Sequence, residues 1–356
     1  MDENKSIRIK DIAEMAGVSV ATVDRVLHQR GKISKESLEK VMKAMKQTNY
    51  KLNLIASTLG TNKLYKIAVL LPDPKDDDFW RQSNSGIIKA KENWVQYNIR
   101  MESFYFNMND KSSFMNAEKQ ALAFSPDGML IAPVMHREAN ILFNILKEKK
   151  IPYIFFNTNI IEAEPISFIG QDLYQSGRVG AEFLMTRLFP RKNIAILHIW
   201  EDVQNGVHLK EKERGFRDYI TEKKNKYFNI HSYNLKICGE KELNREITTI
   251  IKRDNIDGIF VSTSKGSSLT ASVLGKIGRK DIVLIGYDML KENIIYMKEG
   301  LINCLINQNP EKQAFLGVSY LSNFLLFKKR PPVTDLFPLE IVTKENIDSF
   351  LNASIH

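Results

Sequence analysis

The stretch AGVSVATVDRVLHQRG, residues 16–31, decides how the N-terminal part of this chain folds. Ser19 is a residue type that caps the start of a helix, and Val23 and Val26 then share one face of that helix. We expect this face to be buried. The other face carries Val20, Ala21, Asp24, Arg25 and His28. Small side chains beside a single arginine offer no evident catalytic chemistry, so the sequence leaves open what this face contacts.

The neighbouring sequence predicts two more short helices, so residues 8–50 form a three-helix unit. Gly17 ends the first helix, and Ser34 caps the third. The apolar stripe of the first helix is Ile9, Ile12, Ala13 and Ala16, and that of the third is Leu38, Val41, Met42 and Met45. Each helix is short, so we expect each to need the other two to bury its stripe.

Residues 51–63, KLNLIASTLGTNK, are polar and contain one short helical phrase between Asn53 and Gly60. A helix of this length is marginal in water on its own because nucleation is costly. We therefore predict a linker helix that forms only under suitable conditions.

From residue 66 onward the sequence pattern changes from helical periodicity to continuous apolar runs, which are typical of parallel strands covered on both faces. The predicted strands are 66–72, 127–133, 151–157, 193–199, 256–262, 281–288 and 302–308. The predicted helices between them are 83–96, 112–123, 137–149, 175–189, 208–223 and 266–276. This alternation favours a doubly wound α/β fold, and the number of strands indicates two similar halves with a cleft between them.

The composition is that of a cytoplasmic protein with a polyanionic partner. Residues 1–63 contain 12 Lys and Arg against 7 Asp and Glu, a large share of the formal net charge of +9 in 356 residues. Cys238 and Cys304 lie too far apart in the sequence to suggest a disulfide framework or a metal site. We find no secretory signal and no apolar run long enough to span a bilayer.

The sequence also lacks the motifs of common enzymes. No G-x-G-x-x-G follows the first strand, and neither a phosphate-binding P-loop nor a G-x-S-x-G elbow occurs. We therefore expect no catalytic residue, no cofactor and no metal.

The motif D-x-A-x-x-A-G-V-S-x-x-T-V-x-R-V at 11–26, followed by NLIASTLG at 53–60, resembles the lactose-repressor (LacI) family. The resemblance implies a helix-turn-helix headpiece over 1–50, a hinge helix over 51–63, and an effector-binding and dimerisation core over 64–356 that is similar to periplasmic sugar-binding proteins. FW at 79–80 and INQNPEKQAFLGV at 306–318 look most like the ribose-binding branch. We expect an N-terminal half over 64–167 and 300–327, and a C-terminal half over 168–299 and 328–356.

By this resemblance the second helix lies in the major groove of an operator. Arg25 would bond guanine, Val20 and Ala21 would make apolar contacts to bases, and Ser19 and Thr22 would contact phosphates. The resemblance also implies that Leu59 is wedged into the minor groove. The predicted DNA-binding residues are Ser19, Val20, Ala21, Thr22, Arg25, His28 and Leu59.

Ligands of doubly wound folds bind at the carboxyl ends of the strands, where this sequence has aromatic, amide and charged residues. The predicted effector-binding residues are Phe79, Trp80, Arg137, Asp172, Lys212, Thr263, Asp288 and Gln308. Such a set suits a sugar or sugar derivative, whose hydroxyls both donate and accept hydrogen bonds. We expect Asp76, Asp77 and His136 to lie in solvent.

The function that these features favour is a transcriptional regulator, a repressor by resemblance, whose operator affinity depends on a small ligand. A palindromic operator requires two headpieces, so we expect a homodimer. Two alternatives stay open at this point: a cytosolic sugar-binding protein, or a sugar-acting α/β enzyme, without a DNA role.

Overall fold

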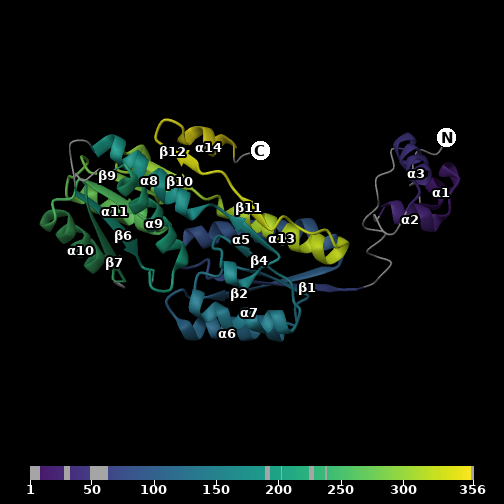
Figure 1. Ribbon diagram of the computed structural model, residues 1–356. Helices are drawn as coiled ribbons and strands as arrows, with labels where there is room; N and C mark the ends of the chain where they lie inside the picture. The colour runs from purple at the N-terminus through teal and green to yellow at the C-terminus, as the bar shows by residue number, and fades with distance from the viewer. Residues whose placement is uncertain are drawn as a thin grey trace. The chain divides into compact units, whose positions relative to one another are not determined.

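The computed structural model of this chain describes residues 9–27, 33–48, 63–188, 193–201, 203–223, 228–236 and 239–353. It divides into two compact units, Met1–Lys63 and Leu64–His356, which are described one at a time (Figure 1). The predicted hinge helix, with Leu59, and His28 fall outside the described residues.

The first unit contains α1 (Ile9–Ala16), α2 (Val20–Leu27) and α3 (Lys35–Gln47). Its small core joins Ile12, Val23 and Val41, one from each helix. The predicted caps are confirmed, because the Ser19 hydroxyl accepts from the Thr22 N–H at 3.1 Å and the Ser34 hydroxyl from the Ser37 N–H at 3.2 Å.

The predicted apolar stripe of α3 is only partly buried. Leu38 and Met42 are 42% and 56% exposed, whereas Val41 and Ala44 lie in the core. The reason is that α3 turns the Val41–Ala44 face toward α1 and α2, which leaves the flanking apolar positions outside the contact.

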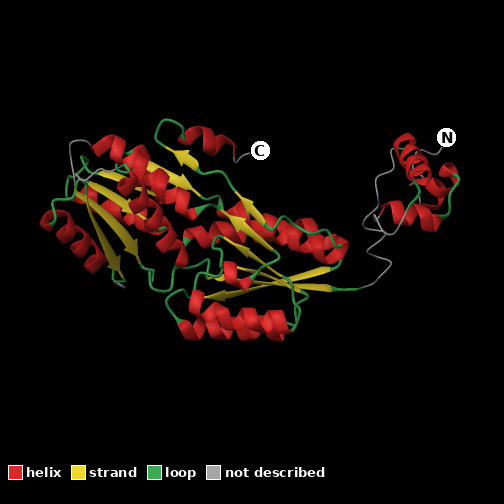
Figure 2. Ribbon diagram, viewed as in Figure 1, coloured by secondary structure: helices red, strands yellow, loops and turns green. Residues whose placement is uncertain are grey.

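The second unit contains two six-stranded sheets, seen as two groups of arrows in Figure 2. The first has the order β11 (Thr334–Leu336), β5 (Ser167–Gly170), β4 (Tyr153–Phe156), β3 (Gly128–Ile131), β1 (Tyr65–Pro72) and β2 (Ile99–Phe106). The second has the order β12 (Glu340–Val342), β10 (Cys304–Asn307), β9 (Val283–Tyr287), β8 (Gly258–Val261), β6 (Asn193–Ile199) and β7 (Asn229–Leu235). Neighbouring strands are parallel except for β10 and β12.

Helices cover both faces of each sheet, as a doubly wound fold requires (Figure 1). Around the first sheet lie α5 (Asp78–Trp94), α6 (Lys111–Ala123), α7 (His136–Glu148) and α13 (Pro310–Phe327), with the short helices η1 (Val95–Tyr97) and η2 (Ile161–Ala163). Around the second lie α8 (Leu173–Leu188), α9 (Val207–Glu222), α10 (Glu240–Arg253), α11 (Ser264–Lys276), α12 (Lys291–Lys298) and α14 (Ile347–Ala353). No helix in the described ranges is both long and apolar enough to cross a membrane.

The chain crosses between the two halves three times, after β5, β10 and β11. These crossings correct the boundaries expected from sequence. Residues 168–170 complete β5 in the first sheet, 304–307 form β10 in the second, and 334–336 form β11 in the first sheet beside β5. The side chain of Gln171 joins all three crossings, because its Nε2 donates to the carbonyl oxygens of Asn307 at 2.9 Å and Pro338 at 2.8 Å.

Candidate functional site

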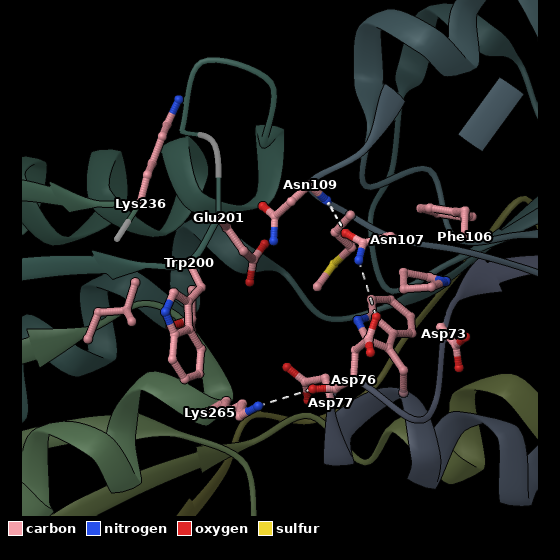
Figure 3. Close-up of a pocket in the computed structure, with 15 residues that line it drawn as sticks. Asp73, Asp76, Asp77, Phe106, Asn107, Asn109, Trp200, Glu201, Lys236 and Lys265 are labelled. Carbon is pink, nitrogen blue, oxygen red and sulfur yellow. Dashed lines mark hydrogen bonds between the residues drawn. The ribbon is translucent and has the colours of Figure 1, made fainter. Parts of the chain in front are cut away.

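A cavity of about 470 Å³ lies between the two halves of the second unit (Figure 3). Its walls are the loops that follow β1, β2 and β6, together with the start of α11. The carboxyl ends of parallel strands from both sheets therefore meet at this cleft, where doubly wound folds bind their ligands. The volume lies within the usual range for small-molecule sites.

A smaller recess of about 30 Å³ brings together five of the eight side chains predicted to bind an effector. They are Phe79, Trp80, Lys212, Thr263 and Gln308. Trp80 and Thr263 also line the larger cavity, so the recess and the cavity share a wall.

The aromatic part of this wall comes from the first turn of α5. The rings of Phe79 and Trp80 meet edge to face with centroids 4.9 Å apart, and the Trp80 ring meets Phe156 of β4 at 6.1 Å. Trp80 is only 4% exposed, so packing holds its ring in place. A fixed aromatic surface of this kind suits the apolar face of a small ring-shaped ligand.

The charged part of the recess is Lys212, which α9 carries into the second half. Its ammonium donates to the Ser262 carbonyl oxygen at 3.0 Å and lies 3.6 Å from the centroid of the Tyr287 ring. Burial lowers the pKa of Lys212 to about 8, and the charges of Asp288 and Glu201 oppose that fall. The lysine is therefore a buried cation at the edge of the cavity.

Two carboxylates face the cleft from opposite halves. The Asp77 carboxylate caps α5 by accepting from the Phe79 N–H at 2.7 Å. Burial raises the pKa of Asp77 to about 7, and Glu201 across the cleft adds to that rise. Burial acts in the same direction on Glu201, but the charge and hydrogen bond of His208, whose Nε2 lies 2.6 Å from the carboxylate, outweigh it and lower the pKa of Glu201.

Two buried polar atoms in the cleft wall have no hydrogen-bond partner: Oγ1 of Thr263 and Nδ1 of His208. Buried polar atoms are normally hydrogen-bonded, so such atoms beside a cavity indicate groups that a bound molecule or water would satisfy.

Three of the predicted effector residues do not line the cavities. Asp288 is fully buried, and its oxygens accept from Ser264 Oγ, the Gln308 N–H at 2.8 Å and Gln308 Nε2 at 2.7 Å. Burial raises the pKa of Asp288. Asp288 does not line the recess itself, but its hydrogen bonds hold Gln308, which does. Arg137 is exposed in the first turn of α7, and the exposed Asp172 carboxylate accepts from the Gln175 N–H at 2.9 Å near the start of α8.

The sequence analysis missed several cleft residues. Asp76 and Asp77 both line the larger cavity from the loop after β1: Asp76 is exposed, as expected, whereas Asp77 is partly buried, which corrects the expectation for that residue. Trp200, Glu201, His208 and Lys265 are also in the cleft walls. Trp200 and Glu201 follow the strand at 193–199 directly, so the rule about the carboxyl ends of strands would have found them.

In the first unit, the structure places Ser19, Val20, Ala21 and Arg25 on the exposed surface around α2, with Thr22 partly buried between them. Val20 is 48% exposed, which is unusual for an apolar residue in a helix whose other valines, Val23 and Val26, are buried. The face of α2 that was predicted to contact DNA is therefore exposed to solvent, and Arg25 lies near the C-terminal end of this helix.

Comparisons with known proteins agree with both units. Residues 8–53 match the model of bacterial regulatory proteins of the lacI family, and residues 67–329 match the periplasmic binding protein domain. The chain is 30% identical to a solved structure described as a LacI transcriptional regulator from Bacteroides fragilis, with a TM-score of 0.76 over 81% of this chain and 99% of that one.

Two further relatives extend the comparison. The ribose operon repressor of Halalkalibacterium halodurans is 23% identical over 94% of both chains. A glucose-galactose binding protein from Geobacillus stearothermophilus shares the fold of the core, with a TM-score of 0.70 and 20% identity over 80% of this chain and 99% of that one.

The helix-turn-helix unit and the two-halved core define a DNA-binding transcriptional regulator with a ligand-binding core, and not an enzyme. The chain belongs to the lacI family of bacterial regulatory proteins, with a core of the periplasmic-binding-protein type.

Proposed function

We propose that this regulator acts in the cytoplasm as a homodimer on a palindromic operator, and that a neutral, sugar-sized ligand in the cleft controls its affinity for that DNA. The observation that carries the proposal is the cavity of about 470 Å³ walled by Trp80, amides and carboxylates. The names of the relatives, a ribose operon repressor and a glucose-galactose binding protein, support a carbohydrate.

The charge of the cavity supports a ligand without a negative charge. Asp73, Asp76, Asp77 and Glu201 line it against Lys236 and Lys265. The Lys265 ammonium is already engaged, because it donates to the Asp76 carbonyl oxygen at 3.1 Å. A phosphate or carboxylate on the ligand would meet this acidic wall, whereas hydroxyls would find both donors and acceptors there.

The DNA contacts that we propose follow from the exposed face of α2, with Arg25 as the residue that distinguishes bases. Homodimerisation would use apolar surface near the start of the core, where Leu64 and Ile88 are exposed. In this arrangement the ligand shifts DNA affinity only by its different affinity for the two core states.

The test has two arms. The first arm uses a palindrome that the protein selects from random duplexes. The difference in binding free energy between this palindrome and scrambled DNA should be about 1–3 kcal/mol smaller for Arg25→Ala than for the parent protein. Lys40→Ala, which removes only an exposed ion pair with Glu36 at 2.8 Å, should leave that preference unchanged. A chain that binds no duplex at low ionic strength, or an Arg25→Ala variant as selective as the parent, would refute the DNA assignment.

The second arm is thermal unfolding of the full chain with ribose, glucose, galactose, inositol, sugar acids and sugar phosphates. A specific ligand raises the unfolding temperature by mass action, and we expect this from an uncharged member of the panel. Trp80→Ala should remove the shift. A shift caused only by an acid or phosphate would contradict the neutral-ligand proposal.

A further inference from the structure

Helix α7 in the first half of the core has no cap of its own. Met135 precedes it and makes no side-chain hydrogen bond to it. The first N–H groups of a helix have no partner within the helix and need acceptors from elsewhere. Here the N–H of Arg137 donates to Asn205 Oδ1 at 2.9 Å, and the N–H of His136 points to the Asn205 carbonyl oxygen at 3.4 Å.

Asn205 belongs to the opposite half of the core. It lies in the turn directly before α9, the helix that carries His208 and Lys212 to the cleft. Its side chain also donates from Nδ2 to Glu138 Oε2 at 2.7 Å. One residue of the second half therefore makes three hydrogen bonds to the first turn of α7.

We propose that Asn205 is a helix cap supplied across the cleft, so that α7 is capped only while the two halves are closed. Opening the cleft leaves two N–H groups of α7 to water and breaks the hydrogen bond from Asn205 to Glu138, which keeps only its longer contact of 3.9 Å with the Lys111 ammonium. The cap therefore favours the closed arrangement whether or not a ligand is bound. Asn205 is a positioning residue, and it is distinct from the wall residues of the larger cavity.

This cap differs from the other polar contacts between the halves. Lys265 reaches the Asp76 carbonyl oxygen, and Gln82 Nε2 reaches the Met289 carbonyl oxygen at 3.4 Å, each by one long side chain. Such side chains can follow a moving partner. The short side chain of Asn205 cannot, and the Asn205 backbone carbonyl oxygen also accepts from the His136 N–H, which ties the backbone of this turn to α7 as well. We therefore expect the cap to break early in opening.

The experiment measures the distance between the two halves by double electron–electron resonance between two spin labels on the full chain, without DNA or added ligand. Spin labels are placed at exposed positions by Lys119→Cys in α6 and Lys241→Cys in α10. Cys238→Ser removes one native thiol. Cys304 is buried, and burial raises its pKa to about 12, so it does not react with the label.

Wild-type protein should show a major population at the distance that the structure has. Asn205→Ala should lower the ratio of closed to open molecules about fivefold, the factor usually associated with the loss of one helix cap. Glu138→Ala should lower the ratio less, and Glu138→Gln, which keeps an acceptor oxygen, should not. Asn140→Ala is the matched control, because Asn140 is an exposed asparagine of the same helix.

An unchanged distance distribution in Asn205→Ala overturns the proposal, as does an equal change in Asn140→Ala or a wild-type protein found only at longer distances. If Asn205→Ala does not fold, the comparison of Glu138→Ala with Glu138→Gln decides. The inference concerns the two halves of the core alone and does not depend on the proposed function. Because the measurement uses neither DNA nor effector, failure to bind DNA would leave its result standing.

Discussion

Replacing Asp77 with asparagine should stabilise the core of this regulator at neutral and alkaline pH. Asp77 combines two roles that the substitution separates. Its oxygen caps α5 by accepting from the Phe79 N–H, and asparagine is an equally good cap. Its negative charge, however, is held in a partly buried position opposite Glu201; the loss of solvent, with a smaller contribution from Glu201, raises the pKa of Asp77 from 3.8 to about 7. Asparagine keeps the cap and removes the charge.

The size and sign of the effect follow from this shift. Because the folded state holds the Asp77 proton more tightly than the unfolded chain, stability is lost as pH rises from about 4 to 7. At about 1.4 kcal/mol for each pH unit the upper limit is about 4 kcal/mol. Asp77 is partly exposed, so solvent screening reduces the expected gain for Asp77→Asn to about 2 kcal/mol at pH 8.

The assay is urea unfolding between pH 4 and 8, followed by tryptophan fluorescence. Trp80, Trp94 and Trp200 all lie in the second unit, so the signal reports on the core alone. Asp110→Asn is the control, because Asp110 caps α6 in the same way, from the Ser112 N–H at 2.8 Å, but its pKa is lowered by that serine. A gain for Asp77→Asn that does not change with pH, or an equal gain for Asp110→Asn, would refute the reasoning.

Two further substitutions test the surroundings of Lys212, each by urea unfolding. Lys212→Met should lower the free energy of unfolding by about 3 kcal/mol, because it leaves the buried Asp288 carboxylate without its cation. Adding Asp288→Asn should recover part of that loss. Strictly additive effects of the two substitutions would contradict the pairing. Gly177→Ala should lower the free energy of unfolding by about 2 kcal/mol or more, because its Cβ would lie 1.9 Å from the Lys212 carbonyl oxygen and force α8 away from α9. Gly239→Ala is the control: its Cβ would meet only the flexible Glu242 side chain at 3.4 Å, so stability should change little. Equal losses for the two variants would count against this packing.

The fold could be predicted where buried strands form a long apolar run; β5 is buried along its length but was missed, because only Phe168 and Ile169 of its four residues have apolar side chains. All seven strands predicted from continuous apolar runs occur, because their burial leaves no polar alternation to confuse the pattern. The edge strand β2 was missed, since its burial alternates along the chain, and β7 is mostly exposed. β11 and β12 were missed because three residues are too few for a pattern.

The position of a side chain in the cleft wall was predictable for the aromatic pair in α5 and the lysine in α9, which line the recess as expected. It was not predictable for the acids. Asp77 and Asp172 both precede a helix, yet one faces the cleft and the other faces solvent. Only the packing of the two halves, which brings Glu201 near Asp77, distinguishes them.

The amide of Gln171 holds the three crossings together, so the first half of the core can rotate about that one place. Strand β1 runs eight residues from Tyr65 to the cleft, so the point where the chain enters it stands about 26 Å from the cleft edge. Each degree of rotation about the crossings then moves that entry point by roughly half an ångström. A rotation of about 7° would therefore move the entry point by about 3.4 Å, the length of one base step of DNA.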